Sequence, residues 1–297
     1  MKIGFIGVGN MGGPMCRNLI RNTNHAVRVF DRDPARVAAC TAIGATAATS
    51  VAALAAWADV VITSLATPDI VEAVALGADG IAANIGAGGT YIDLSTNSPA
   101  IAKRLQAGMA AHAATMLEAP VSGGVARAED GSITIMVGGE AALFEAHLPL
   151  LASFSGSVIH VGPVGMASVA KLINNMLAFC NMAAAAEGLA MAAAAGIDLG
   201  KLRDVVATSS GASAAFTSLT RKSFAGDFAP SFALDLAHKD MRLAQQMADD
   251  LGVPGLVGPP VLTLLRMARN MGLGGADSTA MIQVYERITG RDVRHAE

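Results

Sequence analysis

The sequence has few cysteines, few aromatic residues and few charges. Its three cysteines are widely spaced and form no CxxC pair, which argues against a disulfide framework or a thiolate metal site and favours a reducing compartment such as the cytoplasm. Aromatic residues make up only 4% and charged residues only 15% of the chain. The formal net charge is −3 and no basic run occurs, so we expect neither nucleic acid nor a membrane surface as a partner. Small-molecule chemistry is the class of function that is left.

Long uninterrupted apolar runs are also scarce, although hydrophobic residues make up 53% of the chain. The longest stretch, 181–196, contains Glu187 and two glycines, which fits a buried helix better than a membrane span of about 20 apolar residues. The N-terminal MKIGFIGVGN is broken by glycines and lacks a small-residue cleavage site, so we expect no signal peptide. We therefore expect a soluble protein, and 297 residues suggest roughly two domains.

Up to about residue 160, short β-branched runs alternate with helical stretches. This alternation predicts an α/β fold with a doubly wound, mostly parallel sheet and helices on both faces. The expected strands are 2–6, 26–30, 59–65, 90–95, 115–119, 133–138 and 157–162. From Met166 onward, helix-forming residues continue for about 30 residues, which predicts one long helix followed by shorter ones. We predict two domains, 1–163 and an all-α domain over 164–297, with Arg291–Glu297 as a loose end.

Residues 7–12 (GVGNMG) form a GxGxxG motif between the first expected strand and a helix. In this motif Gly7 allows the tight turn, Gly9 lets the backbone approach a pyrophosphate, and Gly12 allows close helix packing. Asp31 ends the second expected strand, at the spacing of roughly 20 residues typical of the acidic residue that binds the adenosine ribose. The context predicts a Rossmann dinucleotide-binding domain rather than an isolated glycine turn.

Asp31 and Arg32 make opposite predictions about the cofactor. Asp31 favours NAD, because the 2′-phosphate of NADP would face a carboxylate. Arg32 is able to stack on the adenine or to bind a 2′-phosphate, and its alternative role is that of a solvated loop charge. NAD is therefore the expected cofactor, and NADP stays open.

Five segments, in order, resemble the β-hydroxyacid dehydrogenases, the family that includes 3-hydroxyisobutyrate dehydrogenase, tartronate semialdehyde reductase and 2-(hydroxymethyl)glutarate dehydrogenase. The segments are FIGVGNMGGPM (5–15), DLSTNSP (93–99), EAPVSGG (118–124), GMASVAKLINN (165–175) and FALDLAHKD (232–240). The similarity extends over nearly the whole chain, and the C-terminal half looks most like the 2-(hydroxymethyl)glutarate dehydrogenase branch.

The resemblance implies roles for individual residues. Lys171 and Asn175 are the implied catalytic residues, and Ser95 is implied to lie near the nicotinamide. The cofactor-binding residues that we expect are Gly7, Gly9, Asn10, Met11, Gly12, Asp31, Arg32, Leu65, Thr96 and Lys239. The substrate-binding residues that we expect are Ser122, Gly123, Gly124, Lys171, Asn174 and Asn175.

The position of Lys171 makes chemical sense apart from the resemblance. It stands on an otherwise apolar helix stripe, with Asn174 and Asn175 three and four residues further on. A helix lysine usually extends to solvent, but amides favour helix ends over helix interiors, so this cluster points to a buried polar site. Apolar burial lowers a lysine pKa, and a near-neutral Lys171 accepts the alcohol proton during oxidation and donates it in the reverse direction.

The other implied residues have structural alternatives. Ser122–Gly124 offers a hydroxyl and unhindered N–H groups that hold a carboxylate, or it forms only a tight turn. Lys239 is implied to close over the site, and its alternative is a surface charge paired with Asp235 or Asp240. His238 has no ligand cluster at metal spacing, so we expect no metal.

Four positions bear on how closely the chain follows the family pattern. Glu118 replaces the expected aspartate in EAPVSGG, and Ala66 replaces a common proline. Ala212 stands where some members carry an arginine, which argues against a dicarboxylate substrate. Arg127 offers a second contact to an anion, or it is a loop charge beside its acidic neighbours.

We predict an NAD(P)-dependent enzyme that reversibly oxidises the primary alcohol of a small 3-hydroxy acid to its semialdehyde. One alternative is a semialdehyde reductase acting on tartronate, succinate or sulfonate-type semialdehydes. An imine reductase and a non-catalytic dinucleotide-binding module are two further alternatives. Imine reductases usually lack the helix lysine, and a non-catalytic module is expected to lack it too, so the presence of Lys171 disfavours both. The alanine-rich helical half predicts a homodimer or homotetramer.

Overall fold

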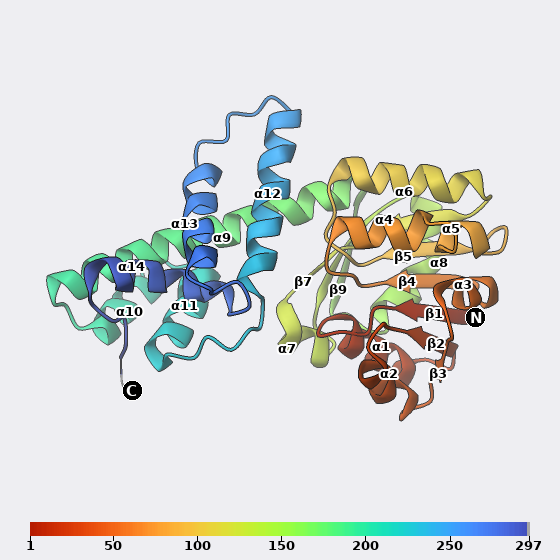
Figure 1. The fold of residues 1–297 in the computed structure, drawn as a ribbon, viewed down its shortest axis with the longest axis horizontal. Helices are drawn as coiled ribbons and strands as arrows, with labels where there is room; N and C mark the ends of the chain where they lie inside the picture. The colour runs from red at the N-terminus through yellow and green to blue at the C-terminus, as the bar shows by residue number, and fades with distance from the viewer. Residues whose placement is uncertain (296–297) are drawn as a thin grey trace. The chain divides into compact units, whose positions relative to one another are not determined.

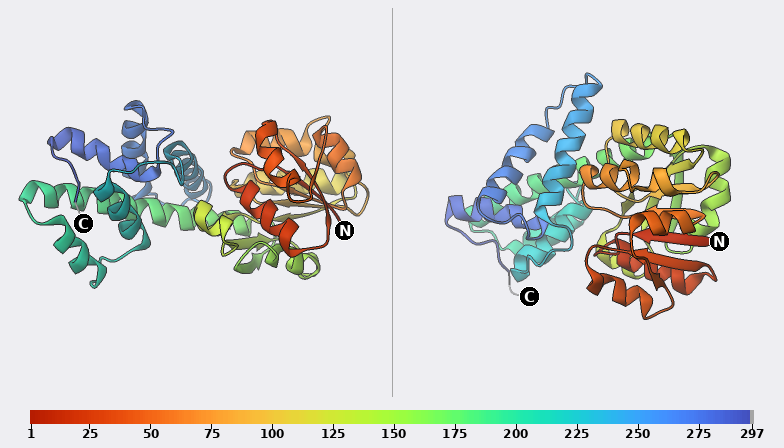
Figure 2. Two further views of the ribbon diagram at one scale, coloured as in Figure 1. Left: turned by 90° about the horizontal axis from the view of Figure 1, so that it is seen from below. Right: turned by 45° about the vertical axis from the view of Figure 1, so that its right-hand side comes forward.

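The computed structural model describes residues 1–295 and divides into two compact units. Unit 1, Met1–Lys171, contains one nine-stranded sheet flanked by helices, and unit 2, which begins at Leu172, is helical (Figures 1 and 2). This arrangement confirms the predicted fold class, a Rossmann-type sheet followed by an all-α part.

The sheet of unit 1 is mostly parallel. Its strands are β1 (Lys2–Ile6), β2 (Ala26–Phe30), β3 (Thr46–Ala47), β4 (Val60–Thr63), β5 (Thr90–Asp93), β6 (Thr115–Glu118), β7 (Val121–Ser122), β8 (Thr134–Gly138) and β9 (Ser157–Gly162). The strand order is β3-β2-β1-β4-β5-β6-β8-β7, and β9 pairs with β8. Only the pairings of β8 with β6 and β7 are antiparallel. The two-residue strands β3 and β7 were not predicted, because so short a segment carries no periodicity.

The order of the strands locates a switch point in the sheet. The chain moves outward from β1 to β2 and β3, and then returns to place β4 on the other side of β1. The loops that follow β1 and β4 therefore diverge at the carboxyl ends of these strands. In open α/β sheets, ligands bind at such a switch point.

The helices of unit 1 are α1 (Gly12–Asn22), α2 (Pro34–Thr41), α3 (Val51–Trp57), α4 (Pro68–Leu76), α5 (Ile81–Asn84), α6 (Pro99–Ala111), α7 (Gly124–Glu129) and α8 (Ala141–Ala152). Four of them begin at a side chain that caps the first turn. Side chains of Asp33, Ser50, Thr67 and Ser98 cap α2, α3, α4 and α6. A proline stands in the first turn of α2, α4 and α6, where its missing N–H costs nothing.

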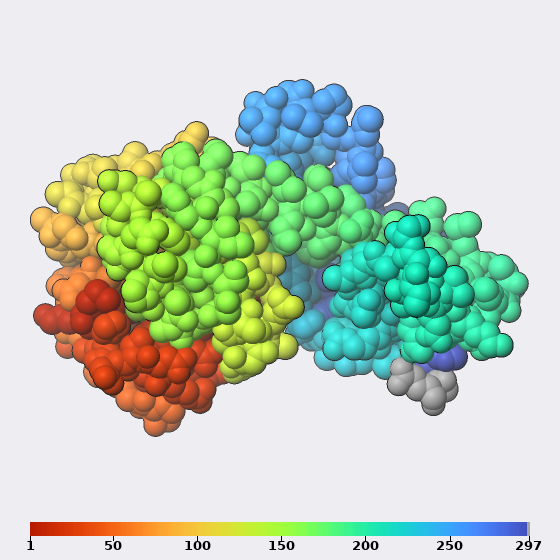
Figure 3. All heavy atoms as spheres, turned by 180° about the vertical axis from the view of Figure 1, so that it is seen from behind, coloured from red at the N-terminus to blue at the C-terminus, as the bar shows by residue number. Residues whose placement is uncertain are grey.

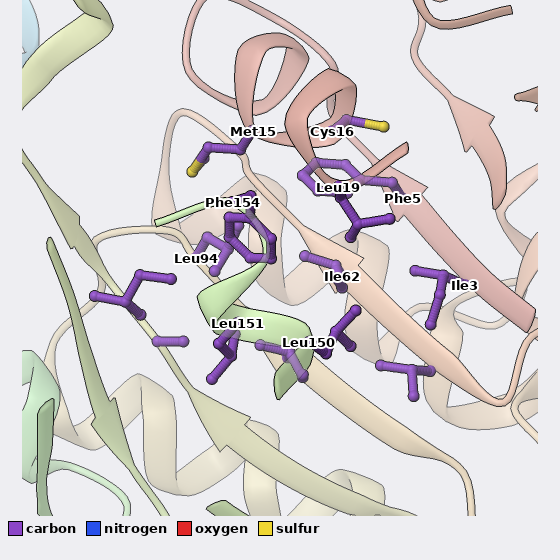
Figure 4. Packing of buried hydrophobic residues seen from close by; sticks show 14 of the residues in the cluster. Ile3, Phe5, Met15, Cys16, Leu19, Ile62, Leu94, Leu150, Leu151 and Phe154 are labelled. Carbon is purple, nitrogen blue, oxygen red and sulfur yellow. The ribbon is translucent and has the colours of Figure 1, made fainter. Parts of the chain in front are cut away.

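Apolar side chains cover both faces of the sheet. On one face, residues of α1 and α8 pack against β1 and β4, as Figure 4 shows for Met15, Leu19, Leu150, Leu151, Phe5 and Ile62. On the other face, α3 to α6 contribute a second cluster that includes Leu54, Val71, Ile81 and Leu105. At the edge of this cluster the half-buried Trp57 carries Arg28 above its ring, with the guanidinium carbon 4.3 Å from the ring centroid.

Unit 2 is built around α9 (Met166–Ala195), the predicted long helix. The helices that follow are α10 (Leu199–Ala207), α11 (Ala214–Ala225), α12 (Leu234–Asp250), α13 (Gly258–Asn270), a 3-10 turn (Ser278–Met281) and α14 (Ile282–Thr289). By length and composition α9 is apolar enough to cross a membrane, a test that core helices also pass. Phe179 and Leu189 of α9 pack with Leu219, Met241 and Leu265 from other helices, so α9 is a core helix. In Figure 3, atoms of α9, α10 and α11 form much of the visible surface of unit 2, beside the region where α12 and α13 meet.

The prediction placed the domain boundary after residue 163. Contacts divide the chain later, after Lys171 and within α9. The first residues of α9 go with unit 1 because they are hydrogen bonded to Glu118 at the end of β6.

The predicted loose end is wrong for residues 291–295. Val293 is fully buried, and its N–H donates to Glu286 Oε1 at 2.9 Å. Arg294 forms an ion pair with the same carboxylate, and the ring of His295 lies 5.4 Å from that of Phe224. The buried Val293 and the ion pair of Arg294 with Glu286 hold this segment in place. A short, mostly polar sequence gives no sign of such contacts. Residues 296 and 297 lie outside the described part of the chain.

Candidate functional site

The loop after β1 fits a dinucleotide. Gly7 has φ +86°, and a Cβ at Gly12 would overlap the carbonyl oxygen of Gly7, so only glycine is compatible with this turn. The N-cap residue of α1, Met11, makes no side-chain capping bond, and its side chain packs against the core. No side chain caps this helix end, and an uncapped helix N-terminus after a glycine loop is the arrangement that binds a phosphate in dinucleotide-binding folds. Asn10 is exposed beside them.

Asp31 lies next to this loop. Its carboxylate accepts from the N–H of Val8 at 2.9 Å and from the N–H of Asp33 at 3.0 Å, which holds it against the glycine loop. Arg32 is exposed. Arg36, on α2, lies over Gly9, because an added Cβ there would stand 2.5 Å from Arg36 Nη1. The structure thus brings an acidic residue and an unpredicted arginine to the expected ribose position.

The loops after β4 and β5 are tied together. The Leu65 N–H donates to Ser95 Oγ at 2.9 Å, and Thr96 follows in the same loop. Behind them Asp93, 1% exposed, accepts from Thr63 Oγ1 at 2.7 Å and from Asn97 Nδ2 at 2.6 Å. Sequence reasoning missed this buried support. An aspartate at the end of a buried strand is the signal that would have indicated it.

The Ser122–Gly124 segment runs from the last residue of β7 through Gly123 to the first residue of α7. Gly123 and Gly124 have φ +141° and +75°, which side chains with a Cβ rarely adopt. The aliphatic part of Arg127 packs on Gly123, because a Cβ there would stand 2.8 Å from Arg127 Cδ. Arg127 is therefore a neighbour of this loop. Asn18 of α1 donates to the carbonyl of Ala128 at 2.9 Å, which connects the dinucleotide helix to α7.

Lys171 is buried, with 6% of its surface exposed, and it lies in the second turn of α9. Long charged side chains are rarely this buried unless they are partnered. Of the two asparagines on the same helix, Asn175 is buried and Asn174 is exposed. Ile173 and Leu177, two apolar neighbours of the lysine along the helix, are 43% and 52% exposed, so the apolar stripe is narrower than predicted.

A second polar cluster lies within unit 2. Asn175 Nδ2 donates to Asp240 Oδ2 at 2.6 Å, and Asn174 Nδ2 donates to Asn175 Oδ1 at 3.0 Å. Lys239 Nζ lies 3.1 Å from Asp240 Oδ1, and Asp240 is 1% exposed. The structure therefore brings Asn174, Asn175 and Lys239 together through Asp240, which sequence reasoning had named only as a surface partner.

His238, beside Lys239, takes no part in this cluster. Burial lowers its pKa, and its Nδ1 lies 3.3 Å from Arg269 Nη1. Over residues 1–295, no group of three His, Cys, Asp or Glu side chains is arranged to hold a metal ion.

Two family models match the chain. The NAD binding domain of 6-phosphogluconate dehydrogenase matches residues 2–162. The model described as NAD-binding of NADP-dependent 3-hydroxyisobutyrate dehydrogenase matches residues 165–285.

Individual proteins match over nearly the full length. The chain is 38% identical over 294 residues to the 2-(hydroxymethyl)glutarate dehydrogenase of Eubacterium barkeri, covering 99% of this chain and 97% of that protein. It is 33% identical over 297 residues to the NAD-dependent L-serine dehydrogenase of Pseudomonas aeruginosa, covering 98% and 99%. A solved 3-hydroxyisobutyrate dehydrogenase from Salmonella typhimurium matches with a TM-score of 0.87 at 32% identity, covering 96% of this chain and 99% of that one. The chain therefore belongs to the β-hydroxyacid dehydrogenase family and is an NAD(P)-dependent hydroxyacid dehydrogenase.

Proposed function

We propose that the chain reversibly oxidises the primary alcohol of a small 3-hydroxy acid to its semialdehyde, with Lys171 as the general acid and base. The observation that carries this proposal is the burial of Lys171, which is 6% exposed on α9. A buried amine is placed to accept the proton of a bound alcohol and to return it in the reverse direction. The bound nicotinamide supplies the hydride acceptor.

The remaining residues take binding and orienting roles in this proposal. Gly7, Gly9, Asn10, Met11 and Gly12 bind the pyrophosphate with backbone N–H groups, and Asp31 and Arg32 contact the adenosine ribose. Leu65 and Thr96 contact the nicotinamide side. Ser122, Gly123 and Gly124 hold the substrate carboxylate. Asn174 and Asn175 orient substrate and lysine, and Lys239, tied to Asp240, contacts the cofactor.

NAD is the preferred cofactor in this proposal, and the substrate is a small mono-anionic hydroxy acid. The carboxylate of Asp31, held by two backbone N–H groups, supports the preference for NAD. Ala212, exposed between α10 and α11, supplies no positive charge for a second carboxylate, which supports a mono-anionic substrate. Arg127, packed on Gly123, is the residue that would extend the range to a second anionic group, as in 2-(hydroxymethyl)glutarate or a sulfonate. We place the enzyme in the cytoplasm as a homodimer or homotetramer, and we keep 1–163 and 164–297 as its functional domains.

A substrate panel tests the reaction. The panel contains 3-hydroxyisobutyrate, L-serine, glycerate, a sulfonate analogue, 2-(hydroxymethyl)glutarate and 4-hydroxybutyrate, each with NAD and with NADP, followed by nicotinamide absorbance. We expect turnover of one or more 3-hydroxy acids and little of 4-hydroxybutyrate. Dinucleotide binding without turnover of any of them, in either direction, would favour a non-catalytic module instead.

A lysine variant tests the mechanism. Lys171→Ala should lower kcat by about 10²- to 10⁴-fold, the usual scale for general acid–base catalysis, with unchanged NAD affinity by calorimetry. The exposed Lys201 on α10 provides the matched control, and Lys201→Ala should leave kcat unchanged. A near-normal kcat with a raised KM would make Lys171 a substrate anchor, with Lys239 as the next candidate for the proton.

A further inference from the structure

Glu118 is the acidic residue that replaces the expected aspartate, and it makes an unusual set of contacts. It ends β6 and is only 3% exposed. Its Oε1 accepts from the N–H groups of Gly165 at 2.5 Å and Ala167 at 2.9 Å. Its Oε2 accepts from Ser168 twice, from the N–H at 3.3 Å and from the hydroxyl at 2.6 Å. One carboxylate therefore accepts hydrogen bonds from three backbone N–H groups and one hydroxyl at the start of α9.

Helix capping alone does not require this arrangement. Elsewhere in unit 1, exposed or half-buried Ser50, Ser98 and Asp33 cap their helices with one acceptor each. At Glu118, burial raises the pKa of the carboxyl and the four hydrogen bonds offset this only in part. Its ionised form is therefore less stable there than in water. A serine would cap this helix without burying a charge. The presence of a buried carboxylate instead indicates that Glu118 has a role beyond stability.

The capped turn lies directly before Lys171. Ser168 and Lys171 are three residues apart on α9 and so share one face of the helix. Side chains on a helix lean toward its N-terminus, so we expect the side chain of Lys171 to lean over the turn that Glu118 holds. A shift of this turn displaces the lysine amine with it.

The strand on the other side of Glu118 leaves room for its carboxylate. Gly138, at the end of β8, pairs with Glu118. A Cβ at Gly138 would overlap Glu118 Oε1, the atom that accepts from Gly165 and Ala167. Glycine at this position therefore allows the carboxylate to reach α9.

We propose that Glu118 is a positioning residue for Lys171, which it holds at its working position by fixing the first turn of α9. The inference rests on the proposed function of Lys171. It assigns to Glu118 no contact with substrate or cofactor. Its effect is carried by the backbone of residues 165–168.

A double-mutant cycle in the full-length chain tests this proposal. Glu118→Ala should lower kcat by about 10- to 100-fold, the scale expected for a misplaced catalytic group, while NAD affinity by calorimetry stays unchanged. Glu118→Gln should lose less than Glu118→Ala, because its amide oxygen still accepts from Gly165 and Ala167 while Ser168 Oγ turns to accept from the amide. In a Lys171→Ala background, Glu118→Ala should have no further effect on kcat.

Further variants separate positioning from loss of stability. Gly138→Ala keeps the charge of Glu118 but displaces it, so kcat should fall here too, which gives a second route if Glu118→Ala does not fold. Asp198→Ala removes the cap of α10, whose Asp198 Oδ1 accepts from the Lys201 N–H, and should leave kcat unchanged. A folded Glu118→Ala or Gly138→Ala enzyme with normal kcat, or multiplicative losses in the double variant, would overturn the proposal. A normal kcat for Lys171→Ala alone would instead overturn the proposed function.

Discussion

At the residue scale, opposite charges meet where the adenosine ribose is expected. Asp31 is held by two backbone N–H groups, whereas Arg32 and Arg36 are exposed. Arg36 Nε lies 3.4 Å from Asp33 Oδ2, so a second carboxylate competes for this arginine. A 2′-phosphate at this position would face the carboxylate of Asp31, and Arg36 is already shared with the carboxylate of Asp33.

Replacing Asp31 should change the cofactor preference. The wild-type enzyme should have a lower KM for NAD than for NADP, and Asp31→Ser should relax this preference because it removes the repulsion of the 2′-phosphate. Steady-state kinetics with both cofactors measure the effect. Adding Arg32→Ala to Asp31→Ser shows whether the arginine then binds the phosphate, in which case NADP use falls again. Equal use of both cofactors by the wild type would contradict the assignment.

Some site residues were readable from the sequence and others were not. Gly7, Gly12 and Asp31 were predicted because their spacing reflects local geometry that the chain itself sets. The partners of Glu118 and Asp240 were not, because Glu118 bonds to residues 165–168 and Asp240 bonds to Asn175. Such pairs depend on how distant elements pack, which spacing along the chain does not report.

At the scale of elements, the strands of the sheet and α9 were predicted nearly at their observed bounds, because periodicity and caps are local signals. The misses were the two-residue strands and the last segment, where a single buried side chain or ion pair decides the structure.

The segment before α12 is anchored by Asp277, which is 2% exposed. Its carboxylate accepts from the Ser231 hydroxyl at 2.6 Å and from the Thr279 hydroxyl at 2.8 Å. Burial alone would raise the pKa of Asp277, but these hydrogen bonds outweigh it and lower the pKa. The stabilisation is therefore present above the unfolded pKa of about 3.9 and is lost as pH falls through the lower folded value.

Asp277→Ala should lower the free energy of unfolding by about 3 kcal/mol at neutral pH, because it leaves buried donors unsatisfied. The difference from wild type should shrink in acid as the wild-type carboxylate is protonated. Urea titrations at several pH values measure both effects. Asp249→Asn, an exposed acid on α12, is the control and should change little. A difference that grows in acid would contradict the assignment.

Truncation after Gly290 should destabilise unit 2 by about 3 kcal/mol, because it removes the buried Val293 and leaves Glu286 without Arg294. Thermal unfolding monitored by circular dichroism checks this. Arg291→Ala, in the full-length chain, keeps Val293 and the Glu286 pair and is the matched comparison. An unchanged transition in the truncated chain would show that the segment adds nothing to stability.

At the scale of the whole molecule, large apolar side chains remain exposed on unit 2. Met191, Val205 and Leu256 are 66%, 61% and 83% exposed. Exposed apolar surface of this kind is typical of faces that association buries. Light scattering at micromolar concentration should therefore give the mass of a dimer or tetramer, and a monomer mass would refute the expectation. Val205→Glu and Leu256→Glu, made separately, identify the buried face by which of them dissociates the assembly.

Trp57, with Arg28 above its ring, allows the unfolding of unit 1 to be followed by fluorescence. The sequence contains one tryptophan, and it lies on α3 of unit 1. Its fluorescence therefore reports the unfolding of unit 1, whereas far-ultraviolet ellipticity reports the helices of both units. Loss of the guanidinium above the ring on unfolding changes the surroundings of the emitting indole. A dinucleotide that binds the β1 loop should raise the midpoint of the emission curve, so one native fluorophore separates the melting of the nucleotide-binding unit from that of the helical one.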